Sequence, residues 1–315
     1  MEFQSGIVQI QSFLAVTIGI IVLFVGKRLN DRFSLLREFS IPEPVTGGLL
    51  ASILLGLLYF VSDLEIQFDL QARDVLLVYF FTTIGINSSA RDLLSGGKPL
   101  LILLAITLCF MVAQNLTGIG VAALFDLQSA VGVLGGTVSL IGGHGTTIAW
   151  APHFIEQQDI ANAKEIGIAC ATLGLILASL MGGPTAKLLI GRYRLAPSPG
   201  AMQEVRDIGF TDAQKKMGIG HLDFLDAVLA IHVCVIVGYL PLFVTCLFAG
   251  ILITNLIPKG LPTLSGTRWP ARTPSMALIA DIALGTFLAM SLMSMQLWTL
   301  IDLAGPILAI LTAQF

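Results

Sequence analysis

The chain has 315 residues, of which 55% are hydrophobic and 12% are charged, and its formal net charge is −3. A soluble domain carries about 25% charged residues, so this composition excludes an ordinary soluble protein. The small net charge and the lack of a basic tract exclude a nucleic-acid-binding protein. Apolar stretches of about 20 residues, the length that crosses a bilayer, recur throughout the chain. The sequence therefore predicts an all-α polytopic membrane protein.

The placement of charge predicts the topology of the first half of the chain. Lys and Arg concentrate in cytoplasmic loops, and four of them follow the first apolar stretch: Lys27, Arg28, Arg32 and Arg37. The N-terminus is therefore expected outside, and so is the acid-rich loop at 63–69. The helices expected in this part of the chain span residues 7–25, 43–61, 75–89 and 99–124.

A glycine-rich stretch, SLIGGHGTTIAW at 139–150, interrupts the apolar pattern. If 131–150 crossed the membrane completely, the next span (164–190) would place the basic loop at 191–220 outside. The charge pattern instead favours a re-entrant hairpin, whose irregular backbone survives only beside protein or a water-filled cavity. The alternative is that the glycines let helices pack closely, as in G-x-x-x-G interfaces.

The second half of the chain repeats the first half in inverted orientation. IPEPVTGGLLASILLG at 41–56 returns as LPLFVTCLFAGILITN at 240–255, and the stretch at 81–105 returns at 287–313. By the charge rule the first copy runs from inside to outside and the second from outside to inside. Inverted repeats with broken helices that meet near the midplane are typical of secondary transporters. The expected organisation is a first repeat of five helices and a hairpin (about 131–150) at 1–190, a cytoplasmic linker at 191–220, and a partial second repeat of about four helices at 221–315.

Six motifs follow one another along the chain: IPEPVTGGLL (41–50), TIGIN (83–87), QNLTGIG (114–120), GGHGT (142–146), CATLGLILASLMGGP (170–184) and TFLAM (286–290). In this order they resemble the bacterial glutamate:sodium symporter (ESS) family over nearly the whole chain. The resemblance implies Na⁺-coupled uptake of L-glutamate across the bacterial cytoplasmic (inner) membrane, with Na⁺ as the co-transported ion. It also implies a pair of re-entrant hairpins and a homodimer. A transporter, not an enzyme, is therefore expected.

The glycine-rich stretch is the expected substrate site. A carboxylate can be held by converging backbone N–H groups at a helix N-terminus, and glycine lets a ligand approach the backbone. No Lys or Arg lies deep within an expected span, so backbone groups are expected to hold the substrate in preference to a side-chain cation. For the histidine alone, the alternative is a hydrogen-bonded structural residue. The expected substrate-binding residues are Ser139, Gly142, Gly143, His144, Gly145, Thr146 and Thr147.

Oxygen-bearing side chains in the apolar segments are the expected Na⁺ ligands, because polar groups inside a membrane are costly and are functional candidates by default. One group of them surrounds Gly85, where the helix is expected to be interrupted. The candidates are Thr82, Thr83, Asn87, Gln114, Asn115 and Glu165, and no other metal site is expected. For Gln114 and Asn115 the alternative is hydrogen bonding between helices. For Glu165 it is an anion at the start of a helix.

Two other functions stay open at this point. An intramembrane hydrolase needs a nucleophile–base or carboxylate pair, and neither G-x-S-x-G nor H-E-x-x-H occurs in the sequence. A passive channel for small anions would conduct without coupling to Na⁺.

The repeat also carries an expectation about the end of the chain. Pro306, the counterpart of Pro99, opens an expected span, and nine residues follow it in the sequence. At 1.5 Å per residue these are too few to cross about 30 Å of hydrocarbon. By the repeat, a second glycine-rich hairpin and a further helix would follow. The expectation is that this chain is C-terminally incomplete and does not accumulate glutamate alone.

Overall fold

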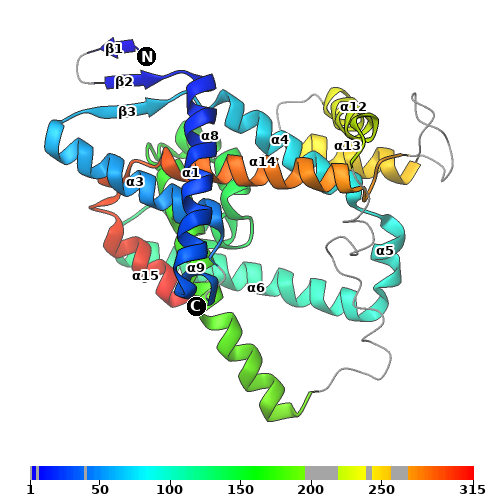
Figure 1. Ribbon diagram of the computed structural model, residues 1–315. Coiled ribbons are helices and arrows are strands. Elements are labelled where there is room, and N and C mark those ends of the chain that lie inside the picture. Colours follow the sequence, from blue (N-terminus) through cyan, green and yellow to red (C-terminus); the bar gives the residue numbers. More distant parts are fainter. Residues whose placement is uncertain (1, 5–6, 39–40, 196–218, 239–242, 257–268) are drawn as a thin grey trace. The chain divides into compact units, whose positions relative to one another are not determined.

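The computed structural model describes residues 2–4, 7–38, 41–195, 219–238, 243–256 and 269–315 (Figure 1). Its elements are β1 (Glu2–Gln4), β2 (Ile7–Ile10), α1 (Ser12–Arg32), α2 (Ser34–Glu38), α3 (Glu43–Ser62), β3 (Glu65–Phe68), α4 (Gln71–Asn87), α5 (Ala90–Ser95), α6 (Gly97–Leu124), α7 (Ser129–Val133), the π-helix η1 (Leu134–Val138), α8 (Gly143–Gln158), α9 (Ala163–Tyr193), α12 (His221–Val237), α13 (Phe243–Leu256), α14 (Pro274–Met293), the 3₁₀ helix η2 (Leu297–Leu300) and α15 (Ala304–Gln314). Most of the linker expected at 191–220 lies outside the described residues.

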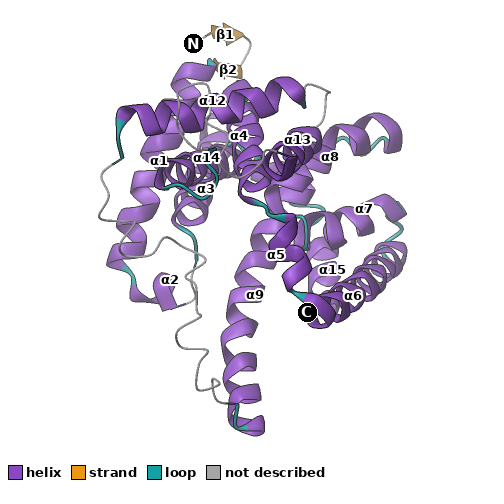
Figure 2. Cartoon of the chain, turned by 90° about the vertical axis from the view of Figure 1, so that its right-hand side faces the viewer, coloured by secondary structure: helices purple, strands orange, loops and turns teal. Residues whose placement is uncertain are grey.

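The chain is mainly helical, as predicted, and the helices dominate the view in Figure 2. Among the described residues, five helices are long and apolar enough to cross a membrane, namely α1, α3, α6, α9 and α14. Helix α6 presents large apolar side chains to its surroundings, and more than half of the surface is exposed for each of Leu101, Ile102, Leu103, Leu104, Ile106 and Leu108. An apolar surface of this extent requires lipid or another apolar partner.

The chain divides into two compact units. The first comprises residues 1–76, 96–180 and 285–315, and the second comprises 77–95 and 181–284. Each unit draws residues from both of the expected repeats. The units are therefore a different division of the chain from the repeats, and the inverted repeat stays a prediction.

A small sheet in the first unit departs from the all-α expectation. Strand β2 pairs antiparallel with β1 and parallel with β3, and Ile7 lies opposite Glu65. The apolar residues at the start of the first expected span alternate in burial, and Val8 and Ile10 are buried. The expectation of a helix from residue 7 is thus wrong, because this segment pairs its backbone with β3 and the helix begins at Ser12.

Helices α1 and α3 pack at backbone distance in the first unit. A Cβ added to Gly26 would overlap the carbonyl oxygen of Glu43, and one added to Gly47 would overlap the carbonyl oxygen of Val22. Asn30 donates a hydrogen bond from Nδ2 to the carbonyl of Ile41 at 2.7 Å. Small residues that let backbones approach are the usual basis of helix association in lipid. Since β2 precedes α1 and β3 follows α3, the sheet joins these two helices at one end.

The second unit has its own apolar core. Its fully or largely buried members come from α4, α12 and α14, and they are Ile86, Ala227, Ala230, Ile231, Cys234, Met276 and Ile279. Helix α4 runs without interruption to Asn87, so the expected break around Gly85 is wrong. Gly85 is there for packing, because a Cβ on it would overlap the carbonyl oxygen of Leu247 in α13.

Candidate functional site

The segment after α6 turns back along α6. Gly132 of α7 lies against Gly118 of α6, so closely that a Cβ on either residue would overlap the backbone of the other. Further along, Thr137 contacts Asn115. The residue numbers rise along one element while they fall along the other, so α7 and η1 run antiparallel to α6.

Helices α7 and η1 form the first arm of this segment, and the arm breaks at Gly136. Its backbone angles, φ −95° and ψ −124°, are non-helical, and the surrounding turn is a π-helix. Asn115 holds the break, because its Oδ1 accepts hydrogen bonds from the backbone N–H of Thr137 at 3.2 Å and from the Thr137 hydroxyl at 2.8 Å. π-Helical turns are rare and occur frequently at functional sites.

The second arm, α8, begins within the predicted glycine-rich stretch. Residues 141–142 form a turn, and Gly143, with φ +70°, starts α8 in the left-handed region that favours glycine. No side chain caps this helix start. The first N–H groups of a helix have no partner within the helix. The Gly142 amide donates to the carbonyl of Thr137 at 3.0 Å. The amides of Gly143, His144 and Gly145 are therefore the ones placed to meet an external acceptor.

Three polar side chains of the glycine-rich stretch, those of Ser139, His144 and Thr147, are buried and hydrogen-bonded, whereas Thr146 is half-buried. The Ser139 hydroxyl donates to the carbonyl of Leu134 at 2.5 Å, and it lies 3.2 Å from the Thr147 hydroxyl. Since the single Ser139 proton is used, Thr147 is the donor in that pair. His144 Nε2 lies 2.9 Å from the Thr172 hydroxyl, whose proton goes to the carbonyl of Ile168. Nε2 of His144 is therefore the protonated nitrogen, and its Nδ1 is left as an acceptor.

The two arms of the segment make their polar contacts at equal distances along α6 and α9. Asn115, beside the break, precedes the end of α6 at Leu124 by nine residues, which is about 14 Å at 1.5 Å per residue. Thr172, beside His144, follows the start of α9 at Ala163 by nine residues. Helix α8 runs antiparallel to α9, because Thr147 packs on Gly167 and His144 bonds Thr172. The tip thus lies about half the thickness of a ~30 Å hydrocarbon core from both helix ends.

The predicted Na⁺ ligands divide between the two units. In the second unit the buried Thr82 and Thr83 hydroxyls donate to carbonyls of their own helix, those of Val78 and Phe80. Asn87 ends α4, and its Oδ1 accepts the backbone N–H of Arg272 at 2.7 Å. Thr82 and Thr83 are thus engaged within their own helix, and Asn87 is engaged with a distant segment of the second unit.

The candidates in the first unit are less uniform. Asn115 Oδ1 already accepts two hydrogen bonds, which occupy both lone pairs of an amide oxygen. The Oε1 atom of Gln114 is buried without a hydrogen-bond partner. Glu165 lies in the first turn of α9, as the reading of a helix-start anion predicts.

Two polar residues of the first unit were missed by sequence reasoning. Gln314 of α15 has both carboxamide atoms buried without partners, and it reaches Gly118, one turn along α6 from Gln114. Arg73 falls in the segment taken as a loop, but it lies in the first turn of α4 and is only 6% exposed. A charged residue that is buried in the first turn of a helix does not add to the hydrophobic periodicity, so the sequence pattern does not reveal its burial.

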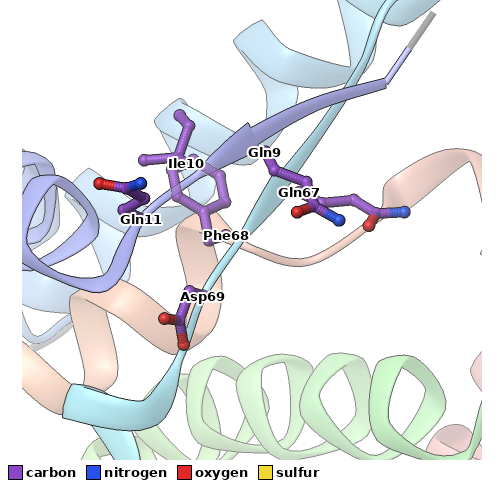
Figure 3. Close-up of a pocket in the computed structure, with 6 residues that line it drawn as sticks. All are labelled: Gln9, Ile10, Gln11, Gln67, Phe68 and Asp69. Atoms are coloured by element: carbon purple, nitrogen blue, oxygen red, sulfur yellow. The ribbon is translucent and has the colours of Figure 1, made fainter. Parts of the chain in front are cut away.

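A cavity of about 350 Å³ lies where β2 and β3 end (Figure 3). It is lined by Gln9, Ile10, Gln11, Gln67, Phe68 and Asp69. None of the predicted binding residues lines this cavity. The candidate site predicted from the sequence lies instead in the broken segment and the two helices along it.

The fold defines a multi-pass membrane protein in which a broken helical segment contacts α6 through η1 and α9 through α8. The family model described as sodium/glutamate symporter matches residues 8–315, and the chain belongs to this family. The sodium/glutamate symporter of Escherichia coli (strain K12) is 36% identical over 308 residues, which cover 93% of this chain and 75% of that protein. That of Haemophilus influenzae is 34% identical over 308 residues, or 93% of this chain and 74% of that protein. No solved structure matches.

Proposed function

We propose that the chain serves a secondary active transporter that takes up L-glutamate by Na⁺ symport and alternating access. The observation that carries the proposal is the broken segment, in which the uncapped start of α8 lies beside Thr172, nine residues from the start of α9. Membership of the symporter family supports the choice of cargo and ion, since the relatives' names state both. Neither the hydrolase nor the passive channel is favoured by this family.

The hairpin is proposed to enter and leave the membrane on one face. Two observations support this proposal. Its arms run antiparallel to α6 and α9, and its tip is nine residues from the end of one and the start of the other. Lys164, at the start of α9, also lies within electrostatic range of Arg73, next to the loop expected outside. A full crossing would put these two residues on opposite faces, about 30 Å apart.

A carboxylate of the substrate would lie at the start of α8. The amides of Gly143, His144 and Gly145 precede the first intrahelical hydrogen bonds, and the helix dipole adds a positive partial charge there. The hydroxyl of Thr146 is the adjacent polar group. Ser139, His144 and Thr147 are bonded behind the tip, so we assign them to positioning the backbone.

The coupling ion would use carboxamide oxygens on α6 and α15. Gln114 Oε1 is buried and unpartnered, and so is Oε1 of Gln314, whose Nε2 lies against Gly118. An unpartnered buried acceptor is costly unless a ligand satisfies it, and Na⁺ prefers oxygen ligands. We assign Asn115 to holding the break and not to the ion, because its oxygen is occupied.

The finer features of the proposal rest on charge placement and family resemblance. We infer a location in the bacterial inner membrane, an external N-terminus and a cytoplasmic segment at 191–220. We also infer inverted repeats and a homodimer. The particle mass in detergent, measured by light scattering, tests the homodimer directly.

Binding of labelled L-glutamate to the purified chain in lipid nanodiscs tests the function. The expected result is tight binding in NaCl and at least fivefold weaker binding in choline chloride, with glutamate recovered unchanged. A passive channel predicts the same affinity in both salts. A hydrolase predicts conversion of its substrate.

A further inference from the structure

Arg73 is an incompletely paired buried cation. Its side chain is 7% exposed, and both Nε and Nη2 donate to the same oxygen of Asp74, at 2.9 and 2.5 Å. The third nitrogen, Nη1, is buried and has no hydrogen-bond partner. Buried charged groups are almost always fully hydrogen-bonded. The free edge of this guanidinium therefore lacks an acceptor of the kind that a carboxylate provides.

A second cation lies close to it. Lys164, in the first turn of α9, is half-buried and interacts electrostatically with Arg73, Asp74 and Glu165. Arg73–Asp74 is the ion pair found within the described part of the chain, so neither carboxylate lies within 4 Å of the Lys164 amine. Asp74 itself is 58% exposed and engages one side of Arg73 only. The cluster thus holds one cation with a buried, unpartnered nitrogen and a second cation that is not part of the ion pair.

The cluster lies on the same face of α9 as the hairpin contact. Lys164 precedes Gly167 by three residues, a spacing that puts both on one side of a helix. Gly167 packs directly on Thr147, and a Cβ on it would also come within 3.4 Å of the Ser139 hydroxyl. Thr172, which contacts His144, lies deeper along α9. A ligand held by Lys164 is therefore about one helical turn from the hydroxyls of Ser139 and Thr147, on the side toward the start of α9.

We propose that Arg73 and Lys164 form a capture site that binds a carboxylate of an acidic amino acid before it reaches the hairpin tip. Planar guanidinium edges and ammonium groups are the donors that suit a carboxylate. Glu165 and Asp74, the neighbouring anions, would face the substrate's ammonium group. This inference rests on the proposed function, because it assigns the first contact of the same cargo.

The test compares glutamate binding by wild-type chain, Lys164→Gln, Arg73→Lys and the control Lys98→Gln, each in nanodiscs. Lys98 is an exposed lysine in the first turn of α6, and the control keeps the same change of charge. We expect Lys164→Gln to lower the association rate of glutamate at least fivefold and to remove most of its dependence on salt, since charge at a binding site acts mainly on association. Arg73→Lys should raise the Kd at least fivefold, because a lysine cannot supply the planar edge.

Unliganded thermal midpoints separate this role from a purely structural one, and Lys164→Gln should leave the midpoint unchanged. Glutarate, a dicarboxylate without an ammonium group, is the second probe and should bind wild type more tightly than Lys164→Gln. Wild-type rates in Lys164→Gln, or no binding of glutamate or glutarate to the wild type, would overturn the capture site. Na⁺-independent glutamate binding that these variants still weaken would contradict the symport proposal and leave the capture site standing.

Discussion

At the scale of single residues, the adjacent amides Gln114 and Asn115 have different tasks. The Asn115 oxygen accepts two hydrogen bonds from Thr137 and thereby holds the chain where η1 departs from helical geometry. The Gln114 oxygen is equally enclosed but accepts none. The sequence QN alone cannot distinguish these environments. Gln114 and Asn115 have similar hydropathy, but adjacent positions on a helix point toward different partners.

Replacing Gln114 by methionine separates an ion ligand from a structural amide. Methionine conserves volume and removes the unpartnered acceptor, whose burial costs about 1–3 kcal/mol. The Gln114→Met chain should be as stable as wild type or more stable without Na⁺, and it should lose the stabilisation that Na⁺ gives. Thermal unfolding over a NaCl series, with choline chloride at constant ionic strength, measures both. Equal stabilisation of both chains by Na⁺ would remove Gln114 from the ion site.

Gly143 is expected not to tolerate substitution, because its backbone adopts a positive φ angle. A Cβ there meets nothing within 4 Å, but φ is +70°, a conformation that costs an L side chain about 1–2 kcal/mol. Gly143→Val should weaken glutamate binding at least tenfold by shifting the amides at the start of α8. The control is Gly120→Val in α6, where a Cβ also meets nothing within 4 Å and φ is negative. Unchanged affinity in Gly143→Val would favour the packing role of the glycines.

At the scale of elements, hydropathy and charge predicted α1, α3, α6, α9 and the broken segment near their observed positions. They did not predict β2, because a short alternating run next to a long apolar helix has the same average hydropathy as the helix. They also predicted a break at Gly85. A glycine that breaks a helix and one that admits a neighbouring backbone look alike in one sequence, and only the position of Leu247 distinguishes them.

The hairpin itself is tested by its two ends. Gln128, just after α6, and Gln158, at the end of α8, are both exposed. In a Cys109→Ala background, cysteines at these two positions should react with the same membrane-impermeant reagent in intact cells, because the segment enters and leaves on one face. A cysteine at Lys98, at the other end of α6, is the control and should be shielded. Labelling of only one of the two glutamine positions would indicate a full crossing.

The contact between α1 and α3 gives a prediction about stability. Gly47→Ala would push a methyl group into the carbonyl of Val22, and overpacking of this kind costs about 1–3 kcal/mol. Gly56→Ala in the same helix meets nothing within 4 Å and is the matched control. Thermal midpoints of the two variants in one detergent should differ by several degrees, with Gly47→Ala lower. Equal midpoints would show that the helices separate without cost.

At the scale of the whole molecule, the two compact units each combine residues from both expected repeats. The proposed substrate residues and the carboxamides of α6 and α15 belong to the first unit. Thr82, Thr83 and Asn87 belong to the second unit and make their hydrogen bonds within it. Binding of glutamate and Na⁺ is therefore proposed to need only the first unit. A symporter requires that the two ligands help each other to bind.

The reciprocal coupling of the two ligands tests this central claim most directly. Glutamate affinity is measured by calorimetry at saturating Na⁺ and in choline, and Na⁺ affinity is measured with and without saturating glutamate, all on the purified chain in nanodiscs. Linkage requires the same factor in both directions, and coupling of about 1–3 kcal/mol corresponds to about 5- to 150-fold. We predict that each ligand tightens the other by one common factor of at least five. The same glutamate affinity in Na⁺ and in choline would contradict the account.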